Sequence, residues 1–125
     1  MRKNSDLKVQ GNCYFIAGYL EVINGNVEKA SDYYQKSMEL SQASDYTNGI
    51  IRGYKGMGDV AENQGNYVEA LEHYEAGMAI AKAENIRTQQ VVLHNSFGIV
   101  YDNLGLFDKA LENFLAAGTI AKELN

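Results

Sequence analysis

The sequence contains no proline and no tryptophan among its 125 residues. Because proline is common in the turns and at the strand edges of β-sandwiches and barrels, its absence disfavours those folds and suits a mostly helical chain. No apolar run reaches the roughly eighteen residues that a membrane-spanning helix requires. The basic N-terminus is followed by a polar stretch instead of the apolar segment of a signal peptide. We therefore expect a cytoplasmic protein that does not bind a membrane.

Cysteine and histidine are also scarce, with one and two residues. Cys13 is the single cysteine, which excludes an intramolecular disulfide and favours a reducing compartment. We expect Cys13 to pack as a small hydrophobe, His94 to be half-buried and His73 to be exposed. Two histidines in different segments and one cysteine do not form a metal-site pattern. Because no nucleophile, base and orienting group can be assembled, we predict no enzymatic activity, no metal and no cofactor.

Basic residues are in the minority. Eleven lysines and arginines stand against sixteen acidic residues, for a net charge of -5. This balance disfavours a nucleic acid as partner, because the phosphate backbone attracts basic surfaces. With 46% hydrophobic and 22% charged residues, the composition is that of one soluble globular domain.

A repeat of forty residues is the strongest feature that is present. When the chain is shifted by this length, glycines, alanines and aromatic residues fall into shared columns. The columns are Gly18, Gly58 and Gly98; Gly25, Gly65 and Gly105; Ala30, Ala70 and Ala110; and Tyr34, Tyr74 and Phe114. A repeat of this kind determines the architecture, so we expect one domain, 1–125, with units at approximately 5–44, 45–84 and 85–124.

Each unit is predicted to contain two helices. Apolar residues recur at spacings of three and four on both sides of Gly25, Gly65 and Gly105, where a helix must end in a left-handed residue. Asn26 and Asn66 are expected to cap the second helix, and Asp45 and Asn85 to mark the turns between units. Six helices of about 17–20 residues result.

Glycines inside the predicted helices need a packing reason, because each costs about 1 kcal/mol relative to alanine. We expect the two helices of each unit to approach closely at the Gly18 column, with the Ala30 column early on the second helix and the Tyr34 column filling the space one turn further on. Gly49, Gly53 and Gly56 share one helical stripe. They lack the spacing of a phosphate-binding loop, so close helix packing is the preferred interpretation.

The units resemble the tetratricopeptide-repeat family in its longer, forty-residue variety. Tyr14-x-x-Ala17-Gly18, Tyr54-x-x-Met57-Gly58 and His94-x-x-Phe97-Gly98 follow its first motif, and the alanine-x-x-x-aromatic half is complete in all three units. The common repeat of about 34 residues and its closing proline are absent. The resemblance implies an all-α fold: an α-solenoid of three helix-turn-helix repeats, with six antiparallel helices in a right-handed superhelix.

The resemblance also implies a concave groove lined by the first helix of each unit. Projection at about 100° per residue places there Asn12, Phe15, Tyr19, Val22, Ile23, Arg52, Lys55, Asp59, Glu62, Asn63, Val92, Asn95, Ile99, Asp102 and Asn103. The predicted groove changes from apolar through charged to amide-rich and acidic, which suits a peptide with an apolar anchor and a polar tail. The alternative is that the apolar members belong to the core or contact another chain.

One ligand class of the family is not expected. Chaperone-adaptor members hold a C-terminal carboxylate with basic and amide side chains. At the matching positions this chain has Phe15, Tyr19, Gly56, Val92 and Ser96. We therefore predict a non-catalytic scaffold or adaptor that binds a protein or peptide by other means.

The two ends suggest alternative functions. The last helix is apolar on more than one face, so Phe114, Leu115, Gly118 and Ala121 are candidates for self-association. Phe15, Tyr19, Val22 and Ile23 make the other end apolar as well. Either the chain is part of a longer protein, such as the sensor or regulatory segment of a bacterial signalling protein, or its ends stack between molecules as a homo-oligomer.

Overall fold

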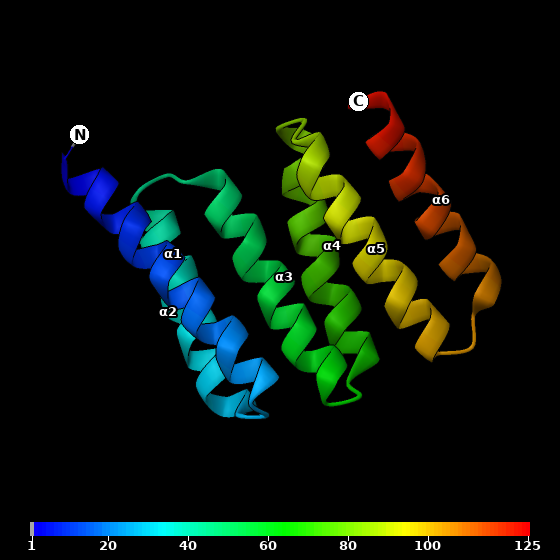
Figure 1. The fold of residues 1–125 in the computed structure, drawn as a ribbon, viewed down its shortest axis with the longest axis horizontal. Helices are drawn as coiled ribbons and strands as arrows, with labels where there is room; N and C mark the ends of the chain where they lie inside the picture. Colours follow the sequence, from blue (N-terminus) through cyan, green and yellow to red (C-terminus); the bar gives the residue numbers. More distant parts are fainter. Residues whose placement is uncertain (1) are drawn as a thin grey trace.

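The computed structural model describes residues 2–125, and these form six helices arranged side by side (Figure 1). The N-terminus and the C-terminus lie at opposite ends of the row. Three helical hairpins follow one another, as the forty-residue repeat predicts. The helices are α1 (Arg2–Ile23), α2 (Val27–Ala43), α3 (Thr47–Asn63), α4 (Tyr67–Ala83), α5 (Arg87–Asn103) and α6 (Phe107–Glu123).

The turns repeat every twenty residues. Three residues separate each pair of consecutive helices, and the middle one always has positive φ. Within the units this residue is Gly25, Gly65 or Gly105, at φ of +77 to +81°. Between the units it is Asp45 or Asn85, at φ of 52 and 54°. Glycine adopts this conformation without strain, and Asp and Asn tolerate it better than other residues, so the sequence positions of all five turns are explained.

The expected asparagine caps are wrong in their chemistry. Asn26 and Asn66 do precede α2 and α4, but neither side chain bonds to the helix. The amide nitrogen of Asn26 instead donates to Oε2 of Glu21, at 2.8 Å. The turn holds its geometry through its backbone, since Asn26 N–H also donates to the carbonyl of Glu21, at 2.8 Å.

Aromatic rings lie directly on the helical glycines. A Cβ atom at Gly18 would lie 2.8 Å from the ring of Tyr34, and one at Gly58 would lie 2.5 Å from the ring of Tyr74. Phe114 covers Gly98 in the same way. The predicted close approach of the two helices at these glycines is therefore confirmed, but the predicted place of the aromatic ring, one turn further on, is wrong: the flat ring needs the space that a missing side chain leaves.

The core lies between the units as well as within them. Tyr34 and Val60 are buried together with Ala30, and Phe15 and Val22 pack against that cluster. A larger cluster joins the second and third units through Ile51, Ala61, Ala70, Tyr74, Met78, Ala81, Leu93, Phe97 and Val100. Gly53 and Gly56 of α3 face Met38 and Tyr34 of α2, which confirms close helix packing as their role.

The first helices of the units form the inner side of the row. α3 contacts both α1 and α5, whereas α2 does not contact α4 and α4 does not contact α6 in the part of the chain that is described. The second helices are therefore spread apart on the outer side. We call the surface formed by α1, α3 and α5 the inner face.

Candidate partner-binding face

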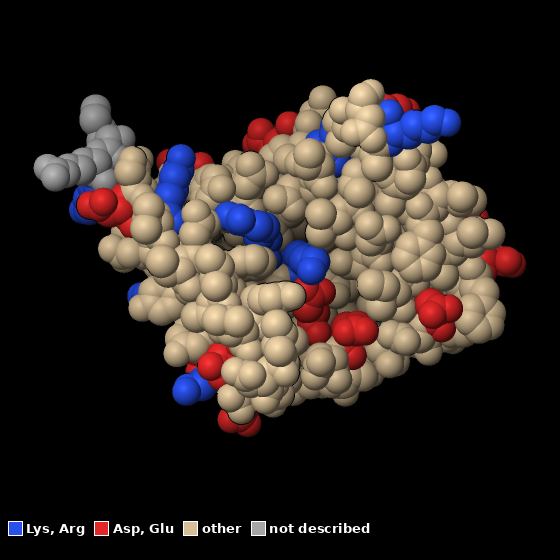
Figure 2. All heavy atoms as spheres, in the orientation of Figure 1, with Lys and Arg blue, Asp and Glu red and all other residues tan. Residues whose placement is uncertain are grey.

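The inner face carries both charge signs side by side. Figure 2 shows basic side chains gathered over α1 and α3, with acidic side chains next to them toward the lower part of α3 and α5. Three of the charged residues predicted for the groove, Arg52, Lys55 and Asp59, lie on α3 and are only partly exposed. The charged strip, Arg52, Lys55 and Asp59, thus belongs to the middle unit, between the mainly apolar residues of α1 and the mixed apolar, amide and acidic residues of α5.

Arg52 links the first two units. Its Nη2 atom donates to Oδ1 of Asn12, at 2.6 Å, and to the hydroxyl of Tyr46, at 3.3 Å. The guanidinium carbon lies 5.3 Å from the centre of the Phe15 ring and 5.6 Å from that of Tyr46. These distances are those of cation–π contacts, so the guanidinium is held between two rings while its Nε–H is buried and has no partner.

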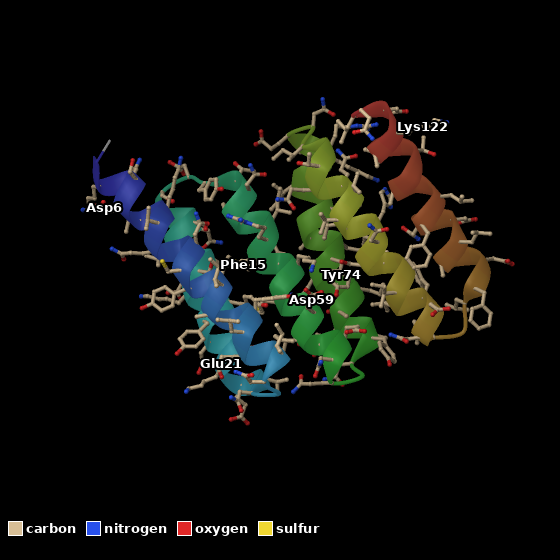
Figure 3. The ribbon with its side chains drawn as sticks, in the orientation of Figure 1. Asp6, Phe15, Glu21, Asp59, Tyr74 and Lys122 are labelled. Carbon is tan, nitrogen blue, oxygen red and sulfur yellow. The ribbon has the colours of Figure 1, made fainter. Side chains whose placement is uncertain are left out.

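Asp59 is the second polar centre of the inner face. Its Oδ1 accepts a hydrogen bond from the hydroxyl of Tyr74, at 2.6 Å, and its Oδ2 accepts one from Nζ of Lys55, at 2.7 Å. Figure 3 shows Asp59 on α3 and Tyr74 beside it, with Phe15 on the side of α1. Both carboxylate oxygens are therefore engaged within the protein, and Asp59 positions the Tyr74 ring over Gly58.

The bond between Asp59 and Tyr74 was not predicted from the sequence, although the second unit contains a signal for it. The residue that corresponds to Asp59 in the third unit is Ile99, and there the aromatic residue is Phe114, which has no hydroxyl. Asp59 thus accompanies the buried Tyr74 and an apolar residue accompanies Phe114, whereas the first unit has Tyr19 at this position beside the buried Tyr34. Because a buried hydroxyl needs a hydrogen-bond partner, the carboxylate in the second unit was a signal for the contact with Tyr74, although the column as a whole does not repeat it.

The third unit supplies the most exposed part of the predicted groove. Asn103 donates to Oε1 of Glu62, at 3.2 Å, and so joins α5 to α3. The other predicted residues of α5 are exposed: Val92, Asn95, Ile99 and Asp102. Tyr19 and Ile23 on α1 and Asn63 on α3 are exposed as well. Phe15 and Val22 are instead half-buried against the Tyr34 cluster.

Two expectations about single residues are wrong, and one is confirmed. Cys13 is exposed, because no helix of the structure covers its face of α1, whereas α2 covers the corresponding Gly53. The side chain of His73 is only 27% exposed and lies 3.7 Å from Glu69. His94 is half-buried as expected, with its Nδ1 atom 3.0 Å from Oδ1 of Asn113.

The residues predicted for self-association lie on an open face of α6. Leu115 is 61% exposed and Phe114 is 40% exposed. Gly118 is exposed, and Ala121 is partly exposed. The end of α1 differs from the expectation, since its open apolar surface consists of Val9, Ile16, Leu20 and Ile23 rather than of Phe15 and Val22.

Two buried tyrosines next to Asp59 have perturbed acidity. Burial raises the pKa of the Tyr34 hydroxyl to about 12, and the nearby Asp59 and Tyr19 add to the effect. Burial also raises the pKa of Tyr74, and Asp59 contributes to this both by its charge and by its hydrogen bond. In both cases the folded protein favours the neutral phenol.

These shifts predict alkaline destabilisation. Because the folded pKa of Tyr34 exceeds the ordinary value of 10.0, its contribution to stability is complete below pH 10 and is lost as the pH rises through about 12. The Tyr34→Phe variant should lose stability less steeply between pH 10 and pH 12, since the contribution of the Tyr34 hydroxyl is then absent. Urea unfolding at several pH values measures both slopes. Equal slopes of stability against pH for the parent and the Tyr34→Phe variant would contradict a raised pKa of Tyr34.

In residues 2–125 no three His, Cys, Asp or Glu side chains are grouped so that they could hold a metal ion. None of the six helices described is both long and apolar enough to cross a membrane.

Comparison with known proteins agrees with the fold and the repeat. No curated protein sequence matches the chain significantly. Among solved structures, the TPR domain of FLU from Arabidopsis superposes with a TM-score of 0.80 and 21% identity, over 94% of this chain and 98% of that one. The tetratricopeptide-repeat family model matches residues 14–83, which is more than half of the chain. This chain therefore belongs to the tetratricopeptide-repeat family.

Proposed function

We propose that the protein is a non-catalytic interaction module that binds an extended segment of a partner protein on its inner face. The observation that carries the proposal is the arrangement of exposed apolar side chains around a charged strip. Tyr19 on α1 is 56% exposed and Ile99 on α5 is 49% exposed, and Arg52 and Lys55 lie between them on α3. Membership of the family supports the same function, because the concave faces of such solenoids are common binding surfaces.

The chemistry of the face suggests what kind of segment it binds. An apolar side chain of the partner would contact Tyr19 and the edge of Phe15. The next polar or acidic groups would meet Lys55 and the guanidinium of Arg52, which Asn12 and two rings hold in place. A preorganised guanidinium loses less side-chain entropy on binding than a mobile one, so Arg52 is suited to anchor a carboxylate or a backbone carbonyl.

The test uses a random peptide library displayed on phage and selected on the immobilised protein. Peptides from the selection are then synthesised, and their affinities are measured by fluorescence anisotropy. We expect Tyr19→Ala and Lys55→Ala each to weaken binding about tenfold or more, which corresponds to about 1.4 kcal/mol. Val68→Ala is the matched control, because Val68 is 71% exposed on α4 and is absent from the inner face.

The outcomes are separable. Thermal melts of the variants test whether the fold is intact. We expect melting temperatures close to that of the parent, because Tyr19 is exposed and Lys55 is partly exposed. Peptides that bind the Tyr19→Ala and Lys55→Ala variants as tightly as the parent protein would contradict the inner face as the site. Loss of binding in Val68→Ala alone would move the site to the outer side of the row.

A further inference from the structure

The internal contacts between units define which faces of the helices stack. A Cβ atom at Gly53 of α3 would lie 2.9 Å from Met38 of α2, and one at Gly56 would lie 2.8 Å from Tyr34. Gly49 faces Ser41 in the same interface. Forty residues later, Leu93 on α5 shares a buried cluster with Met78 and Tyr74 on α4. The second helix of each unit therefore covers one defined stripe on the first helix of the next unit.

The same stripe is open on α1, and we call it the head face: Val9, Cys13, Ile16 and Leu20. These residues correspond to Gly49, Gly53, Gly56 and Val60, all of which are buried. Val9, Ile16 and Leu20 are 61%, 56% and 52% exposed. Apolar side chains thus occupy the positions that a preceding second helix covers elsewhere in the molecule.

The complementary stripe is open on α6, and we call it the tail face: Phe114, Leu115, Gly118 and Ala121. Phe114 is 40% exposed, whereas Tyr34 and Tyr74 in the same column are each 2% exposed. Phe114 packs on Gly98 as the tyrosines pack on theirs, so its inner contact is complete. The difference in exposure comes from the neighbouring first helix that covers Tyr34 and Tyr74.

We propose that the tail face of one molecule packs on the head face of a second copy, in the register that the internal interfaces use. This register places Gly118 opposite Cys13 and Ala121 opposite Val9. In the internal interface the large side chain is on the second helix, where Met38 faces Gly53. At these two pairs the sizes are exchanged between molecules, so that the smaller residue of α6 meets the larger residue of α1. Phe114 meets Ile16, where the internal interface has Tyr34 on Gly56, so the two helices must lie slightly further apart at that point.

Leu115 supplies an independent reason for this partner. At its position the other units have the polar residues Gln35 and Glu75, and Leu115 is exposed. Glu75 lines a hollow of about 380 Å³ together with His94, Phe97 and Asn113. In the repeat, Tyr14, Ala17 and Tyr33 correspond to His94, Phe97 and Asn113. In the proposed register, Leu115 therefore contacts Tyr14, Ala17 and Tyr33 of the second copy.

Those three residues line a hollow on α1 and α2 that is open in the single molecule. Its volume is about 510 Å³, and Val9, Gln10 and Cys13 complete the lining. Its wall is mainly apolar, as the side chain of Leu115 requires. Leu115 is thus apolar where the other units are polar, and the hollow that it would enter on the head side of a second copy is apolar as well. This match favours a second copy as the partner over an unrelated protein.

The contact is heterologous, because different faces of the two molecules meet. Each dimer would still offer one head face and one tail face, so assembly continues into an open chain of molecules unless the rotation closes a ring. This association uses neither Lys55 nor Arg52, so it is independent of peptide binding on the inner face.

Two variants and their mixture test the proposal. Leu115→Glu blocks the tail face, and Val9→Glu blocks the head face. Light scattering over a hundredfold range of concentration should show the parent mass rising above 13.9 kDa. Each variant alone should need about tenfold or more protein to associate, because a carboxylate would be buried among apolar groups. An equimolar mixture should form a one-to-one dimer that does not grow, since each variant supplies the face that the other lacks.

A charge placed outside both faces serves as the control. Val68→Glu adds the same charge at an exposed apolar residue outside both faces and should associate like the parent. A parent protein that stays monomeric at every concentration overturns the proposal. So does a mixture that remains monomeric. Association blocked by Val9→Glu and unaffected by Leu115→Glu would indicate a two-fold contact between head faces instead.

Discussion

Replacing Tyr74 by alanine is expected to lower the free energy of unfolding by about 3–5 kcal/mol. The ring is 2% exposed, fills the space above Gly58 and contacts Phe97, whose ring centre is 5.8 Å away. Its hydroxyl also donates to Asp59, at 2.6 Å. Removal would open a cavity at the junction of the second and third units and leave a carboxylate oxygen without its partner. Because domains of this size are stable by only about 5–15 kcal/mol, much of the stability would be lost.

Phe114→Ala is the matched comparison for this prediction. Phe114 belongs to the same column of the repeat and covers Gly98, but it is 40% exposed. Less apolar surface is buried there, so the variant should cost about half as much or less. Urea unfolding followed by circular dichroism, at a protein concentration low enough to avoid association, measures both. Equal losses of stability in the two variants would show that coverage by the next first helix, which Tyr74 has and Phe114 lacks, does not determine how much these aromatic residues stabilise the fold.

Gly58→Ala is expected to destabilise the protein by about 1–3 kcal/mol, although alanine is the better helix former. The added Cβ would lie 2.5 Å from Cε1 and 2.7 Å from Cδ1 of Tyr74. The ring cannot move away freely, because it is buried and its hydroxyl is bonded to Asp59. The steric cost therefore exceeds the gain in helix propensity, which is about 1 kcal/mol.

Gly11→Ala is expected to change the free energy of unfolding in the opposite direction. Gly11 lies inside α1, and the nearest atoms to its added Cβ would be 3.5 Å away, an ordinary van der Waals distance. This variant should be more stable than the parent by about 0.5–1 kcal/mol. The pair is compared by urea unfolding under identical conditions. Stabilisation by Gly58→Ala would mean that the ring does not need the glycine.

Most of the fold could be predicted from the sequence, because the repeat carries it. The positions of Gly25, Gly65 and Gly105 located three turns, and all three have positive φ. The apolar spacing located the six helices. In a solenoid each unit contacts only its neighbours, so a correct unit and a correct period determine the architecture almost completely.

The details of side-chain contact could not be predicted in the same way. The spacing showed that Gly58 needs a close neighbour, but not whether Ala70 or Tyr74 provides it, since both lie on one face of α4. Apolar surface at both ends could be predicted, but not which residues of the first helix are exposed. Cys13 occupies a position that is buried in the other two units, and a periodic pattern assigns the same environment to every member of a column.

Arg52 shows why the candidate site was harder to predict than the fold. Its projection onto the inner face follows from helical periodicity. Its contacts with Asn12, forty residues earlier, and with Phe15 and Tyr46 depend on rotamers that no periodicity encodes.

The restriction of helix contacts to neighbouring units also governs how the chain reaches its structure. Every contacting pair of helices in residues 2–125 lies within one unit or between adjacent units. The search for native contacts therefore stays local along the chain, and chains with local contacts fold rapidly, in microseconds to milliseconds for helical proteins. Folding can begin in any hairpin and spread to the next, and we expect the middle hairpin, which has a neighbour on both sides, to be the last to open.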